Sequence, residues 1–128
     1  MTLIQAVLLI DHQNAHVHRL DLGPGPGGRL HAHKHNTRQH GSTVRTEHEF
    51  FGEVCDSLEG LNEVLIAGHH LAQADFRHYI EKHRPQLGKL IVGWETVDHP
   101  SDGELLALAR KFFAKHDRMA GRHVAAAP

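Results

Sequence analysis

The sequence predicts an α/β fold with a mixed five-stranded sheet, in the element order βββαβαβα, and with helices on both faces of the sheet. Three observations lead to this prediction. The chain opens with a nearly unbroken aliphatic run, and two strand-like segments follow it at hairpin spacing. Beyond residue 45, stretches with helical spacing alternate with short aliphatic runs. Residues 1–119 contain no linker and no internal repeat, so we expect one domain with a flexible tail at 120–128.

The first three strands are predicted from the start of the chain. Residues 3–10 are aliphatic at successive positions, which is typical of a strand buried on both faces, and the turn-forming residues 11–14 end it. Residues 15–20 and 29–35 are the next strand candidates, separated by a break rich in glycine and proline. This spacing favours an antiparallel meander, with residues 3–10 as the central strand of the sheet.

The first predicted helix follows a polar segment. Thr46 and Glu49 have the spacing of a capping box, and apolar residues then recur at helical spacing until Gly60. We therefore expect this helix to begin at Thr46. Residues 63–67 form a short aliphatic run, which predicts the fourth strand.

The alternation of helix and strand continues to the end of the chain. A helix is predicted at 72–84 and a fifth strand at 90–94. Ser101 and Glu104 form a second capping box at the start of the last helix, which ends near Met119. Because a helix precedes each of the last two strands, we expect both strands to lie parallel to the first one.

The charge balance excludes a strongly basic or acidic protein. Lys and Arg total 14 and Asp and Glu total 15, so the net charge is −1 with neutral histidines. The chain as a whole therefore has no attraction for nucleic acid or anionic membranes. The 15 histidines make its charge sensitive to pH, because imidazole titrates near neutrality. Any contact with RNA must come from a local patch.

The single cysteine, Cys55, excludes an intramolecular disulfide and a cysteine-only zinc site. Its place in an apolar helical pattern predicts a position in the core. This cysteine usage fits a reducing compartment, so we expect a cytoplasmic protein. The aliphatic run at 3–10 is too short to span a bilayer and has no basic leader, so we expect no membrane partner.

Histidines on two predicted strands are the first candidate site. His31, His33 and His35 alternate along one strand, and His16 and His18 alternate along another, so each set shares one face of its strand. A hairpin centred in the glycine-rich break would pair His18 with His31 and His16 with His33, within reach of one divalent ion such as zinc or nickel. The alternative, which we favour because no carboxylate lies nearby to support the imidazoles, is an exposed polar strand face that requires no cofactor.

The segment 31–45 is the second candidate site. It combines histidines with basic residues in a chain that is otherwise neutral, and such a patch can contact the phosphates of RNA. The alternative is a solvated loop, because the segment contains no Phe, Tyr or Trp on which a base could stack. The candidate RNA-binding residues are Lys34, Arg38, Gln39, His40 and Arg45.

A pair of carboxylates is the third candidate. Asp11 follows the first predicted strand and Asp98 follows the fifth, near the edge where the carboxyl ends of parallel strands form a ligand crevice. Such a pair could hold Mg²⁺ in a hydrolase. We favour the interpretation in which both residues form turns, and in which His69 and His70 are turn residues too. No serine or cysteine has the context of a nucleophile elbow, so the sequence offers no catalytic constellation.

A resemblance to known proteins is carried by the stretches IDHQNAHV at 10–17 and VGWETVDHPSDGELL at 92–106. Both resemble small histidine-rich bacterial proteins described as translational machinery proteins. Over nearly its full length, the chain also resembles the middle domain of archaeal and eukaryotic class 1 peptide-chain release factors and of their ribosome-rescue relative Pelota. The resemblance implies the ribonuclease H-like fold of the translational machinery component superfamily, and a domain that can occupy a ribosomal or RNA surface.

The chain departs from the release factors at the residues that release the peptide. Those factors carry Gly-Gly-Gln between the third strand and the first long helix, whereas this chain has Gln39, His40 and Gly41 there. Its adjacent glycines, Gly27 and Gly28, lie in an earlier turn. We therefore expect no peptide release. The sequence also has no counterpart of the codon-reading domain of those factors, so the resemblance does not imply stop-codon decoding.

Three hypotheses follow from the sequence. The first is a non-catalytic binding module, related to translation factors, that contacts the ribosome or RNA through the segment 31–45. The second is a divalent-metal-binding protein that uses the histidines of the second and third strands. The third, and weakest, is a Mg²⁺-dependent hydrolase.

Overall fold

The computed structural model of the chain describes residues 3–22, 29–33 and 43–121, with the backbone alone over 22, 29–33 and 43–46. Within these residues, five strands form one sheet in the order β3-β2-β1-β4-β5, and three α-helices flank it. The strands are β1 (Gln5–Ile10), β2 (Asn14–Arg19), β3 (Arg29–His33), β4 (Glu63–Gly68) and β5 (Ile91–Thr96). The helices are α1 (Thr43–Leu58), α2 (His70–His83) and α3 (Asp102–Met119), with short 3-10 helices η1 (Leu20–Leu22) and η3 (Pro85–Lys89).

The sheet is mixed, as predicted. β1 is its central strand, antiparallel to β2 and parallel to β4, and β5 continues the sheet parallel to β4. β3 pairs antiparallel with β2 and forms one edge of the sheet, while β5 forms the other. Two parallel neighbours need a crossover connection, and α2 supplies the one from β4 to β5. The predicted element order is therefore confirmed.

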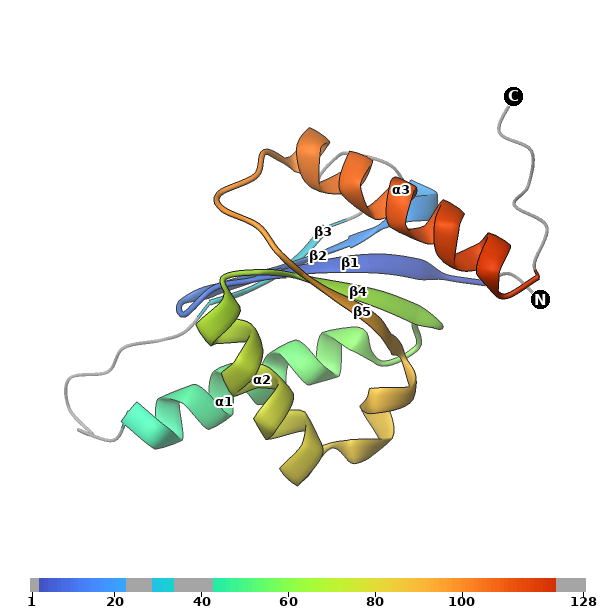
Figure 1. Cartoon of the computed structure of the whole chain (residues 1–128). Coiled ribbons are helices and arrows are strands. Elements are labelled where there is room, and N and C mark those ends of the chain that lie inside the picture. Colours follow the sequence, from blue (N-terminus) through green and yellow to red (C-terminus); the bar gives the residue numbers. More distant parts are fainter. Residues whose placement is uncertain (1–2, 23–28, 34–42, 122–128) are drawn as a thin grey trace.

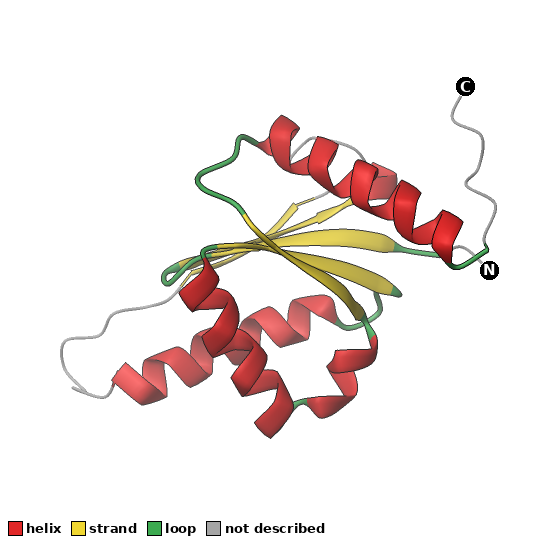
Figure 2. Cartoon of the chain, viewed as in Figure 1, coloured by secondary structure: helices red, strands yellow, loops and turns green. Residues whose placement is uncertain are grey.

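Helices cover both faces of the sheet (Figures 1 and 2). α1 and α2 pack on one face, where Phe51 and Phe76 belong to the same core as Leu8 of β1. α3 packs on the other face, where Leu105 belongs to the same core as Val7 of β1. Successive residues of β1 thus enter opposite cores, which explains why the strand reads as an unbroken aliphatic run.

The start of α1 differs from the prediction. The helix begins at Thr43, so Thr46 lies inside it, and the predicted capping box of Thr46 with Glu49 does not mark its first turn. The residues between 43 and 46 include neither glycine nor proline, so nothing in their backbone chemistry stops the helix from extending toward the N-terminus. Arg45, which we had placed in a loop, is consequently part of α1.

The capping box of α3 is confirmed. Ser101 Oγ accepts a hydrogen bond from the Glu104 backbone N–H at 3.1 Å, and a Glu104 carboxylate oxygen accepts one from the Ser101 backbone N–H at 3.1 Å. This second bond favours the ionised carboxylate and lowers the pKa of Glu104. α3 then runs to Met119, as predicted, and none of the described helices has both the length and the apolar character that crossing a bilayer requires.

Cys55 lies in α1 with its side chain fully buried, so its predicted core position is confirmed. Burial in an apolar environment disfavours the charged thiolate and raises the pKa of the thiol to about 11.

Cys55 should therefore resist thiol reagents in the native protein. Because only an accessible thiolate reacts, we expect labelling at about pH 8 to be at least roughly a hundredfold slower in buffer than in concentrated urea. The thiol of the unfolded chain has its ordinary pKa of 9.0, so it ionises at a lower pH than the buried thiol does. The contribution of Cys55 to the free energy of unfolding is therefore fully present below pH 9 and falls as the pH rises toward 11. The rate of thiol labelling, followed by absorbance, checks the burial, and equal rates in the two solvents would contradict it.

Candidate functional site

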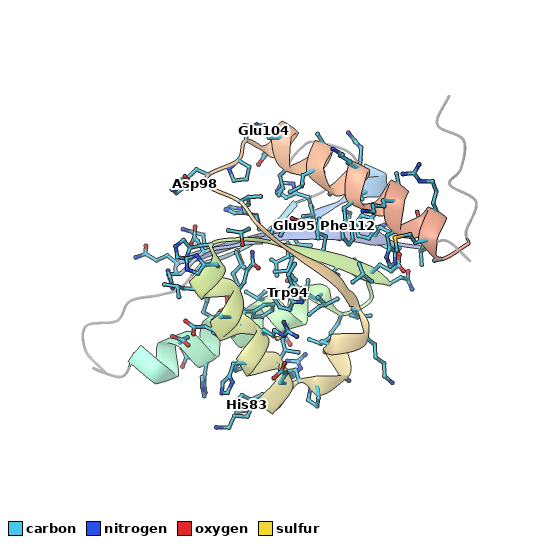
Figure 3. All side chains as sticks on the ribbon, viewed as in Figure 1. His83, Trp94, Glu95, Asp98, Glu104 and Phe112 are labelled. Atoms are coloured by element: carbon cyan, nitrogen blue, oxygen red, sulfur yellow. The ribbon has the colours of Figure 1, made fainter. Side chains whose placement is uncertain are left out.

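A hollow of about 390 Å³ opens where the carboxyl ends of β1, β4 and β5 meet, and we call it the strand-end hollow. These three strands are parallel, so the turns that follow them all lie at the same end of the sheet. The turn after β1 contributes Asp11 and His12, the start of α2 contributes His69, and the loop after β5 contributes Asp98 and His99. Figure 3 shows Asp98 in this loop, before α3. The prediction that Asp11 and Asp98 share a crevice is confirmed.

Asp11 acts as a turn residue, as we favoured from the sequence. Its Oδ1 atom accepts hydrogen bonds from the backbone N–H groups of Gln13 and Asn14, at 2.7 and 2.6 Å. The Asp11 backbone N–H donates to the Asn14 carbonyl oxygen at 2.9 Å. These bonds close the turn between β1 and β2.

Asp98 and His99 form an exposed pair on the other side of the strand-end hollow. Their side chains are 97% exposed, with Asp98 Oδ1 at 3.5 Å from His99 Nε2. The His99 backbone has a φ of 43°, in a region that residues other than glycine seldom adopt. Within the described part of the chain, no group of three or more His, Cys, Asp or Glu residues is placed to hold a metal ion. The Mg²⁺-dependent hydrolase thus stays a prediction from sequence alone.

Imidazole rings gather at the rim of the strand-end hollow. The ring centroids of His12 and His69 are 5.4 Å apart, and His69 stacks on His70 at 4.6 Å. The Nδ1 atom of His69 accepts a hydrogen bond from the Leu71 backbone N–H at 3.3 Å, so His69 caps α2 and His70 is the first residue of the helix. We had predicted both as turn residues and α2 from residue 72. The sequence gives little signal for this cap, because histidine is not among the preferred N-cap residues.

Gly68 lines the strand-end hollow, and the side chain of Gln73 holds the Gly68 carbonyl group in place. The buried Gln73 side chain donates through Nε2 to the carbonyl oxygens of Gly68 at 2.9 Å and of Glu95 at 2.6 Å, which ties the end of β4 to β5. Gly68 has a φ of 141°, and a Cβ atom there would lie 2.0 Å from the Ile10 carbonyl oxygen, so only glycine fits. Sequence reasoning missed Gln73, because one amide within a helical pattern has no distinguishing spacing.

The histidine strands pair in a register that differs from the prediction. The backbone pairs His16 with His31 and His18 with Arg29, whereas we expected His18 opposite His31 and His16 opposite His33. The chain leaves β2 after residue 19 and forms η1, a turn that the prediction did not include. A shift of two residues keeps each side chain on its predicted face of the strand.

His16 and His18 lie on the face of the sheet that α3 covers. His18 pairs with Val7 of β1, is 2% exposed, and has its Nε2 atom 3.8 Å from Oδ1 of Asp102 at the start of α3. The expectation of an exposed polar strand without a nearby carboxylate is therefore wrong for His18. His35 lies outside the described residues, so zinc or nickel binding by the five histidines stays a prediction.

The segment 31–45 is described only at its two ends. Its first residues, up to His33, belong to the edge strand β3, and Arg45 belongs to α1. The candidate RNA-binding residues Lys34, Arg38, Gln39 and His40 lie outside the described residues. RNA contact through this segment stays a prediction.

Comparison with known proteins finds likeness in structure. The sequence matches no protein-family model and no curated protein. Pelota from Archaeoglobus fulgidus matches the fold with a TM-score of 0.58 and 19% identity, over 92% of this chain and 35% of that chain. Pelota from Thermoplasma acidophilum matches with a TM-score of 0.58 and 16% identity, over 92% and 34%. The chain thus spans about a third of the length of these proteins, and the resemblance to a Pelota domain is confirmed for the fold.

Replacing Gln73 with Leu should destabilise the protein by about 1–3 kcal/mol, because the carbonyl oxygens of Gly68 and Glu95 would lose a buried donor. Urea unfolding measures this change. Gln86→Leu, at an exposed position in η3, is the control and should shift the free energy of unfolding by less than about 0.5 kcal/mol. Equal stabilities of the two variants would show that the bridge from β4 to β5 contributes nothing.

Proposed function

We propose that this chain is a non-catalytic binding module, related to translation factors, that contacts the ribosome or RNA through the segment 31–45. The observation that carries the proposal is the structural likeness to Pelota over 92% of the chain. The stretches at 10–17 and 92–106, which resemble those of small histidine-rich bacterial proteins, support a place among the translational machinery proteins, and thus a ribonuclease H-like classification of the fold.

Position and charge favour the segment 31–45 as the contact surface. It joins β3, at the edge of the sheet, to the first turn of α1. Its cations, Lys34, Arg38 and Arg45, stand among histidines, and the segment itself contains neither Asp nor Glu. A polyanion can therefore be attracted here even though the net charge of the chain is only −1.

The absence of catalysis is part of the proposal. The segment carries Gln39, His40 and Gly41 where release factors carry Gly-Gly-Gln. At the strand-end hollow, Asp11 Oδ1 is engaged by two backbone N–H groups, which supports a structural role for that carboxylate.

Co-sedimentation with ribosomes tests the proposal. The double variant Arg38→Ala, Arg45→Ala should associate more weakly than the unmodified chain, and the slope of log affinity against log salt should fall by about 2, since two phosphate contacts are removed. Arg110→Ala, at an exposed position on α3, is the matched control and should sediment as the unmodified chain does.

Two results would overturn this proposal. One is an unmodified chain that stays in the supernatant at low salt. The other is a double variant whose sedimentation equals that of Arg110→Ala, because the basic residues of the segment would then make no contact.

A further inference from the structure

A groove of about 530 Å³ runs between α3 and the edge strand β5, on the opposite side of the sheet from β3. We call it the α3–β5 groove. Val92, Leu108 and Phe112 form its apolar floor, and Met119 closes one end. Figure 3 shows Glu95 and Phe112 where β5 passes α3. The groove shares no residue with the strand-end hollow or with the segment 31–45.

The floor of the groove is apolar and only partly covered. Val92 and Phe112 are half-buried against the core under α3, and Met119 is 79% exposed, the most exposed large apolar side chain of the described residues. Gly93 brings helix and strand close, since a Cβ atom there would lie 2.5 Å from the Phe112 ring. Exposed apolar surface of this kind, next to charged residues, is typical of an interaction site.

The strand beside this floor has one open edge. Among the described residues β5 pairs with β4 alone, so the N–H and C=O groups on its other edge have no strand partner. Extended peptides bind such edges by adding a strand, with backbone hydrogen bonds for affinity and side-chain pockets for selectivity.

Two cations on α3 set the charge of the bound segment. Lys111 and Lys115 are exposed, lie one helical turn apart, and form no ion pair within the described part of the chain. Glu95, on the strand side of the groove, makes no ion pair there either. Acidic side chains that alternate with apolar ones along an extended segment would reach the lysines while the apolar ones fill the floor.

We propose that the α3–β5 groove binds an extended acidic segment of a partner protein, which adds to β5 as a sixth strand. A second copy of the chain fits less well, because pairing two β5 edges would bring the Lys111 and Lys115 pairs of both copies to the same seam. The C-terminal residues 122–128 carry Arg122 and His123, which match the lysines poorly in charge. RNA carries a phosphate at every nucleotide, so its backbone would meet the Glu95 carboxylate, whereas an alternating peptide can place an uncharged residue there.

Binding of defined peptides to the full chain tests the proposal. The probe is a fluorescent peptide of alternating valine and glutamate, compared with a valine–lysine peptide and an oligouridylate. Anisotropy should show saturable binding of the valine–glutamate peptide only, and about tenfold weaker binding to the double variant Lys111→Glu, Lys115→Glu. The control Lys82→Glu, Arg110→Glu changes the net charge equally, at exposed positions outside the groove, and should retain the affinity.

Backbone pairing has its own readout. Methylating alternate backbone nitrogens of the probe, in two complementary patterns, should abolish binding for the pattern that faces β5 and spare the other. Four results would overturn the proposal: no saturable binding up to about 1 mM peptide, equal loss in the control variant, tolerance of both methylation patterns, or stronger binding of oligouridylate. A dimer would also overturn the proposal if it forms at the same concentrations and persists in the Lys111→Glu, Lys115→Glu variant. A second copy of the chain would then occupy the open edge of β5.

Discussion

Burial of β1 on both faces and along both edges constrains the rest of the structure. Ala6, Val7 and Leu8 are fully buried, and they alternate between the core under α1 and α2 and the core under α3. Each fully buried Val or Leu side chain contributes about 1.5–3 kcal/mol, but only if a helix layer covers each face of the sheet. The two edges of β1 need partners as well, which β2 supplies as a hairpin and β4 through a crossover. The three-layer topology follows from that one strand.

The same topology decides where ligands and partners can approach. Parallel β1, β4 and β5 end together, which opens the strand-end hollow. Gly68 lines this hollow, and Gln73 ties the end of β4 to β5. The two sheet edges lie on opposite sides. β3 leads into the basic segment 31–45, and β5 lies beside the apolar floor and the lysines of the α3–β5 groove. The two contact surfaces that we propose therefore lie at separate edges of the sheet.

The fold was predictable because its main signals are local. The aliphatic run of β1 and the capping box of Ser101 with Glu104 depend on spacing alone, and both are confirmed. The details of the candidate site depend on tertiary contacts that spacing does not encode. The pairing of His16 with His31 is set by how the chain leaves β2, and the cap of α2 by His69 is set by its place at the end of β4. The α3–β5 groove exists only once helix and strand are packed.

Residue-resolved amide hydrogen exchange tests the central role of β1 most directly. If β1 holds both cores together, its amides and those of β4 should exchange only through global unfolding and be the slowest in the chain, while those of the edge strand β3 exchange faster. Amides of β1 that exchange as fast as those of β3 would contradict this role, because the two cores would then open without unfolding the whole sheet.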